Sequence, residues 1–158
     1  MPGRTPEGDA LTDLVLPLFE VAAELESAAM SITDGTSLSP AMWKVLGLVI
    51  DEPLTVAEIA RRLGNARQSV QRLANVAVET GAAQWQSNPA HRRSPLLALT
   101  PVGKANLAEL RPRQHRWANA VGGKMGEEDL QCLSSRAEKL LSALRDVSID
   151  RAQLTVAE

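Results

Sequence analysis

The feature that most limits how this chain can fold is a very short turn between two helical segments. Thr55 and Glu58 have the spacing of a capping box, in which each side chain satisfies a free amide of the other, and this opens a helix over 56–63. Gly64 is suited to end that helix. Another helix is expected over about 66–80. Helices joined by so short a turn must cross at a steep angle, which predicts a helix-turn-helix.

Further helices are expected before this motif. Apolar residues at helical spacing predict a helix over 9–33, in which Pro17 marks either the start or a bend. Ser39 followed by Pro40 is a cap and first-turn signal, and it predicts a helix over about 40–51.

Two short strands and two more helices are expected after the motif. The signals are, in order, strands over 82–86 and 95–99 around a basic loop at 87–94, a helix opened by Thr100-Pro101 and interrupted or bent at Pro112, a flexible break at Gly122-Gly123, and a last helix from Gly126. The predicted fold class is therefore mainly α with a small β-hairpin wing.

The helix over 66–80 carries polar side chains suited to DNA on the face opposite its apolar positions. These candidates are Arg67, Gln68, Ser69, Gln71, Arg72 and Asn75. Arginine can form paired hydrogen bonds with guanine, glutamine or asparagine can do so with adenine, and a first-turn serine can donate to phosphate. A polar face that only meets solvent would normally include acidic residues, and none lies between Arg61 and Val78. The pattern therefore favours a recognition helix.

Arg92 and Arg93 lie at the tip of the predicted hairpin. A basic hairpin tip beside a recognition helix can enter the minor groove, whose negative potential attracts arginine. The plainer alternative is a loop that only improves solubility.

The charge distribution agrees with a central nucleic-acid surface. Residues 1–57 carry two basic and nine acidic side chains, residues 58–116 carry ten basic and three acidic, and residues 117–158 carry five basic and seven acidic. The total of −2 thus conceals a centre of +7 between acidic flanks.

Composition excludes several classes of protein. One cysteine cannot form an internal disulfide, and with only two histidines a protein-only metal site is not expected. The sequence holds neither a glycine-rich phosphate loop nor a recognisable nucleophile–base arrangement, so we predict no enzyme, no catalytic residue and no cofactor. No apolar segment is long enough to span a bilayer, and a membrane partner is not expected.

The chain resembles the MarR family of winged helix-turn-helix transcriptional regulators. The matching motifs run from Leu38-Ser-Pro-Ala-Met-Trp-Lys-Val-Leu through Leu54-Thr-Val-Ala-Glu-Ile-Ala, Arg67-Gln-Ser-Val-Gln-Arg-Leu and Arg92-Arg93 to Leu99-Thr-Pro-Val-Gly-Lys. The likeness covers about 9–147. It implies one MarR-like domain over 1–158, with a DNA-binding lobe at 38–100 and dimerisation helices at 9–33 and 101–147.

The resemblance also implies a function. Such proteins are homodimers that present a recognition helix to the major groove and a wing to the minor groove of a pseudo-palindromic operator. They generally repress nearby genes in the cytoplasm, and small aromatic compounds often release them from double-stranded DNA. Trp43 and His115 are the residues we would expect at such an effector site, although a core tryptophan and a surface histidine are the plainer interpretations.

Two departures from the family pattern affect the site. Ala66 stands where a capping serine is common, so we expect Asn65 to cap the recognition helix with Gln68 reaching back. His91 stands where an acidic residue usually braces the wing arginine, which leaves Arg93 less fixed.

Two alternative functions remain open at this point. The winged helix could bind a protein rather than DNA, although its arginine- and glutamine-rich face argues against this. Cys132 could sense peroxide, although no basic cluster surrounds it to lower the thiol pKa, and a packing or interface role is the simpler interpretation.

Overall fold

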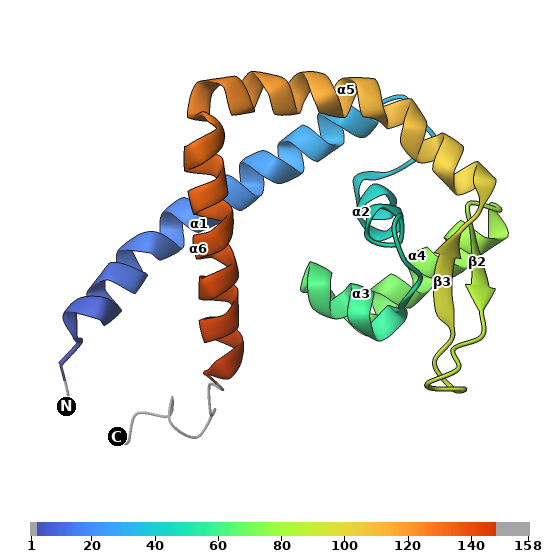
Figure 1. Cartoon of the computed structure of the whole chain (residues 1–158), viewed down its shortest axis with the longest axis horizontal. Coiled ribbons are helices and arrows are strands. Elements are labelled where there is room, and N and C mark those ends of the chain that lie inside the picture. Colours follow the sequence, from blue (N-terminus) through green and yellow to red (C-terminus); the bar gives the residue numbers. More distant parts are fainter. Residues whose placement is uncertain (1–2, 148–158) are drawn as a thin grey trace. The chain divides into compact units, whose positions relative to one another are not determined.

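The computed structural model describes residues 3–147, which form six helices and three strands (Figure 1). The chain divides into two compact units between Gln114 and His115. In chain order the elements are α1 (Pro6–Thr33), α2 (Pro40–Leu48), β1 (Leu54–Thr55), α3 (Val56–Leu63), α4 (Arg67–Glu79), β2 (Ala83–Gln86), β3 (Leu96–Leu99), α5 (Pro101–Met125) and α6 (Glu127–Asp146). The predicted fold class, a mainly helical winged helix-turn-helix with a small β-sheet as its wing, is confirmed.

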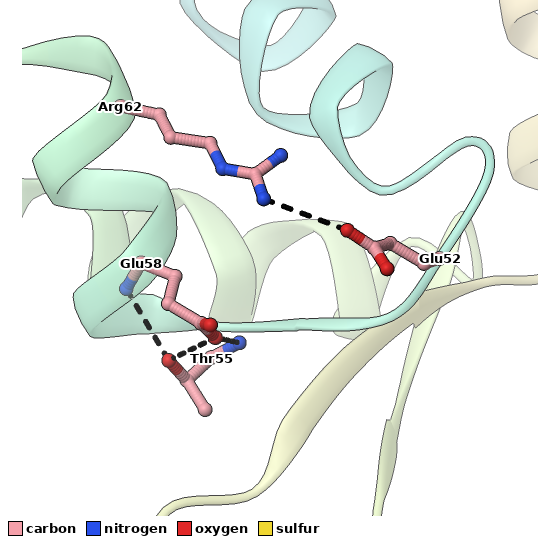
Figure 2. Close-up of polar contacts among 4 residues, drawn as sticks. All are labelled: Glu52, Thr55, Glu58 and Arg62. Carbon is pink, nitrogen blue, oxygen red and sulfur yellow. Dashed lines mark hydrogen bonds and ion pairs between the residues drawn. The ribbon is translucent and has the colours of Figure 1, made fainter.

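The capping box at the start of α3 forms as the sequence predicts (Figure 2). The backbone amide of Glu58 donates to Thr55 Oγ1 at 3.2 Å, and the amide of Thr55 donates to Glu58 Oε2 at 2.9 Å. The Thr55 hydroxyl also donates to the same carboxylate at 2.7 Å. Gly64 ends α3 in the left-handed conformation, with φ of 65°. The position where α3 begins and the position where it ends are thus both set by local chemistry.

Acidification should weaken this capping box. Hydrogen bonds from the Thr55 hydroxyl and then from its backbone amide hold the pKa of Glu58 below its ordinary value. The stabilisation is complete above the unfolded-state pKa of about 4.3 and is lost as the pH falls through the lower folded-state value. The stability advantage of wild type over Glu58→Gln, measured by urea unfolding, should therefore shrink from pH 7 to pH 3.

The matched test for that effect uses Thr55→Ala. This variant should itself cost about 1 kcal/mol as a lost cap, and on its background the Glu58→Gln comparison should depend less on pH. An advantage of the same size at pH 7 and pH 3 would contradict the assignment of the ionised carboxylate to the cap.

The start of α4 differs from the prediction. Ala66, not Asn65, is the N-cap residue, and no side chain caps this helix in the described part of the chain. Asn65 lies one position too early for this role: it follows Gly64, the C-cap of α3, and its backbone amide donates to the carbonyl of Ala60 at 3.0 Å. The first turn of α4 therefore lacks the side-chain cap that the sequence predicted from Asn65 and Gln68.

The core of the lobe lies where α2, α3, α4 and the sheet meet. Its fully buried side chains are Val45, Leu46, Ile59, Val70, Ala74, Ala77 and Leu97. The apolar residues of α4 thus face the core, with Leu73 only partly buried. This packing fixes which face of α4 remains outside.

The wing sheet has one strand more than predicted, in the order β1-β3-β2. Both pairings are antiparallel, with Leu54 opposite Leu97 in one and Trp85 opposite Leu97 in the other. Strand β1 has only two residues, too few to show the alternating pattern from which a strand is predicted.

Proline and glycine interrupt the long helices less than predicted. The first helix begins at Pro6, capped by Thr5, and continues through Pro17, which therefore does not mark its start. The helix α5 continues through Pro112 and Gly122-Gly123, so the predicted break at the glycine pair is wrong. The chain turns instead at Gly126, with φ of 87°. A proline removes only one helical hydrogen bond, and at exposed positions water can serve the carbonyl that is left free.

Candidate nucleic-acid interface

The outer face of α4 is polar and open to solvent. All six candidate residues on this helix are exposed, namely Arg67, Gln68, Ser69, Gln71, Arg72 and Asn75. The opposite face is anchored by Val70, Ala74 and Ala77, none of which is accessible. Their 3.6-residue spacing holds the polar residues on one side, as a helix that reads a groove requires.

Two amides on this face are already joined. Gln71 Nε2 donates to Asn75 Oδ1 at 3.0 Å, across one helical turn. Gln71 Oε1 and Asn75 Nδ2 keep an acceptor and donors available for base edges. The pair therefore offers an acceptor and a donor next to each other on the exposed helix.

A groove of about 430 Å³ joins the helix to the wing. From α4 it is lined by Arg67, Gln68 and Gln71, and from the wing by Arg93 and Ser94. The remaining lining residues are Thr55, Val56, Ala57 and Pro95. The fold thus brings together arginines separated by 26 positions in the sequence. Of the described residues, Ser69, Arg72, Asn75 and Arg92 are candidates that do not line this groove.

A second hollow of about 480 Å³ lies beside the turn of the helix-turn-helix. Arg61 and Arg67 both line it, with Asn65 and Gly64 between them in the sequence. The neighbouring Arg62 is directed elsewhere, toward Glu52 Oε1 at 3.5 Å (Figure 2). Arg61 was not among the sequence candidates, because its place beside Arg67 depends on the crossing of α3 and α4.

The wing tip is organised by a residue that sequence analysis overlooked. Asn88, partly buried between β2 and β3, uses both ends of its amide to bind the backbone of the tip. The Asn88-Pro89 pair is a turn-initiating signal that could have identified it. Arg92 and Arg93 are exposed on this tip.

The other residues named from the sequence lie on three different helices. Trp43 is partly buried on α2, His115 is exposed on α5, and Cys132 is exposed on α6. Within residues 3–147, no cluster of three or more potential ligands is placed to hold a metal ion. Over the same residues, none of the helices is both long and apolar enough to cross a membrane.

Comparisons with known proteins agree with this geometry. A model of the MarR family matches residues 36–94. The uncharacterised protein Rv2011c of Mycobacterium tuberculosis is 35% identical over 137 residues, covering 87% of this chain and 96% of that protein.

Two solved structures share the fold and contain DNA. The transcriptional repressor CouR, bound to a 23-mer DNA duplex, has a TM-score of 0.69 at 23% identity, over 88% of this chain and 99% of that chain. A mutant MarR from E. coli, complexed with operator DNA, has a TM-score of 0.69 at 17% identity, over 84% and 96% of the two chains.

The fold and the family match together define a winged helix-turn-helix regulator of transcription that binds DNA. The chain belongs to the MarR family. Because this is a family of transcriptional regulators, the prediction that the chain is not an enzyme is confirmed.

Proposed function

We propose that this protein represses transcription by binding a pseudo-palindromic operator as a homodimer. In each subunit α4 would enter the major groove and the wing tip would reach the adjacent minor groove. The observation that carries the proposal is the exposed face of α4, which has no acidic side chain before Glu79 at its last position and is continuous with the groove that Arg93 also lines.

The residues divide into two roles on chemical grounds. Arg67, Gln71 and Asn75 are suited to base edges, because guanidinium and amide groups match the hydrogen-bonding pattern of the major groove. Ser69 and Arg72, with Gln68, would add backbone and flanking contacts, and Arg92 and Arg93 would bind in or beside the minor groove. The similar fold of CouR, a transcriptional repressor bound to a DNA duplex, supports the proposed direction of regulation.

Fluorescence anisotropy tests this proposal directly. The purified full-length protein would be titrated onto a labelled duplex from upstream of its own gene, and onto a random duplex, at several salt concentrations. We expect tighter binding to the upstream duplex and a steep salt dependence. Equal, weak binding to both would leave two possibilities: a regulator of distant genes, or a winged helix whose partner is not DNA.

The two arginines that meet at the groove should have separable effects. Arg67→Ala should cost about 1–3 kcal/mol on the upstream duplex and little on the random one, because it removes a base contact. Arg93→Ala should weaken both complexes and lower the salt slope by about one unit, because it removes one charge contact. Arg136→Ala, which removes an exposed arginine from α6, is the matched control. Equal losses from both site variants on random DNA would refute the division of roles.

The remaining parts of the proposal concern assembly and release. The lobe at 38–100 would carry DNA contact, and the helices at 9–33 and 101–147 would form the dimer within one domain over 1–158. A small aromatic compound would release the DNA, with Trp43 and His115 as the proposed ligand residues, and tryptophan fluorescence would report its binding. A regulator of this kind acts in the cytoplasm, where the DNA lies.

A further inference from the structure

The side chain of one residue joins the two ends of the wing tip. Asn88 Oδ1 accepts hydrogen bonds from the backbone amides of Ala90 at 3.1 Å and His91 at 3.3 Å. Asn88 Nδ2 donates to the backbone carbonyl of Ser94 at 3.0 Å. One amide group therefore joins the start of the tip to its end, six positions further along the chain.

These bonds fall on both ends of the turn that carries the arginines. The amide of Ser94 donates to the carbonyl of His91 at 2.9 Å, which closes a turn with Arg92 and Arg93 as its two central residues. His91 begins this turn and Ser94 ends it, and Asn88 binds the backbone of both. A residue outside the turn thus helps the turn's own backbone bond to hold the backbones of the two arginines in place.

We propose that Asn88 is the positioning residue of the DNA-binding wing, holding Arg92 and Arg93 in a preformed turn. This inference rests on the proposed function. It also accounts for His91, which has no carboxylate to brace Arg93: the turn is held from its backbone instead of through the arginine side chain. A tip that is already folded avoids the entropy cost of ordering its backbone when DNA binds.

The test is a double-mutant cycle in the full-length protein, read by anisotropy on the upstream duplex. Asn88→Ala should weaken binding by roughly tenfold, the cost of fixing the backbone of about one residue on binding, and should lower the salt slope. On an Arg92→Ala/Arg93→Ala background the same change should have no further effect, because the side chains that it positions are gone. Asn88→Ser, whose hydroxyl can still accept from the tip amides, should give an intermediate loss.

Three measurements separate positioning from a general loss of structure. Ser87→Ala, a change at the exposed neighbour, should leave binding unchanged, and the melting temperature of Asn88→Ala should match that of wild type. Hydrogen exchange at the amide of Ala90 should accelerate in Asn88→Ala, because this amide loses its acceptor. The amide of His91 should change less, because it also donates to the backbone carbonyl of Asn88 at 3.2 Å, which the variant keeps.

The possible outcomes distinguish this inference from the function on which it rests. If wild type binds the upstream duplex and Asn88→Ala binds it equally well, the positioning role is wrong and the proposed function stands. The role is also wrong if Asn88→Ala weakens binding by the same factor with and without the arginines. Failure of wild type to bind any duplex would overturn both.

Discussion

Replacing Gly103 with alanine should destabilise the winged lobe by about 3 kcal/mol or more, at the upper end of what overpacking costs. Gly103 is buried in the first turn of α5. A Cβ atom there would lie 2.0 Å from the carbonyl oxygen of Ala82 and 2.7 Å from Leu99 Cδ2. A side chain can rotate away from such a contact, but the carbonyl of Ala82 belongs to the backbone.

That carbonyl cannot easily move, because it is part of the attachment of α5 to the lobe. The amide of Thr100 donates to the Ala82 carbonyl at 3.1 Å, and the Thr100 hydroxyl donates to the carbonyl of Gly81. The same hydroxyl accepts from the amide of Gly103 at 3.2 Å, so it also caps the helix. The Thr-Pro-Val-Gly sequence at 100–103 thus combines a cap, an anchor and a close approach of two backbones.

Urea unfolding followed by circular dichroism measures this effect. The control is Gly47→Ala, because Gly47 lies in the helix α2 of the same lobe and an added Cβ would meet nothing within 4 Å. We expect that change to be neutral or to stabilise by about 0.5–1 kcal/mol, as alanine normally does within a helix. A Gly103→Ala protein as stable as wild type would contradict the close packing of α5 on the strand end.

The sequence was informative wherever structure depends on neighbouring residues. The capping box of Thr55 and Glu58 and the left-handed Gly64 involve residues three to five positions apart, and they define the helix-turn-helix without the rest of the fold. The exposed face of α4 also follows from the sequence, because a 3.6-residue period places its polar residues opposite Val70 and Ala74.

Other features depend on contacts between distant residues and could not be predicted. Strand β1 exists because Leu54 pairs with Leu97, 43 positions further along the chain. The approach of Arg93 to the groove that Arg67 lines likewise requires the wing to fold beside α4. For the site, the sequence therefore predicts which residues are polar and exposed on α4, whereas the groove and the Asn88 bridge need the three-dimensional structure.

Placing glutamates on the exposed apolar residues of α6 should convert the proposed homodimer into a monomer. None of the residues of this helix is buried, although it carries apolar residues at helical spacing. Leu133 and Leu144 are each 55% exposed. The helix α1 has the same character, with Phe19 at 67% and Leu16 at 70%. Exposed apolar stripes of this extent need a partner surface, and a second copy of the chain would supply one.

The double variant Leu133→Glu/Leu144→Glu places charges where the proposed dimer excludes water, which costs several kcal/mol for each unpaired charge. Sedimentation should show a mass of two chains for wild type and of one chain for the variant, with specific binding to the upstream duplex lost. The control is Ser135→Glu. Because successive residues of a helix are rotated by about 100°, Ser135 lies on the face opposite Leu133 and Leu144, and this variant should remain a dimer. A double variant that stays dimeric would exclude the stripe of α6 from the interface. A wild-type mass of one chain would refute the homodimer itself.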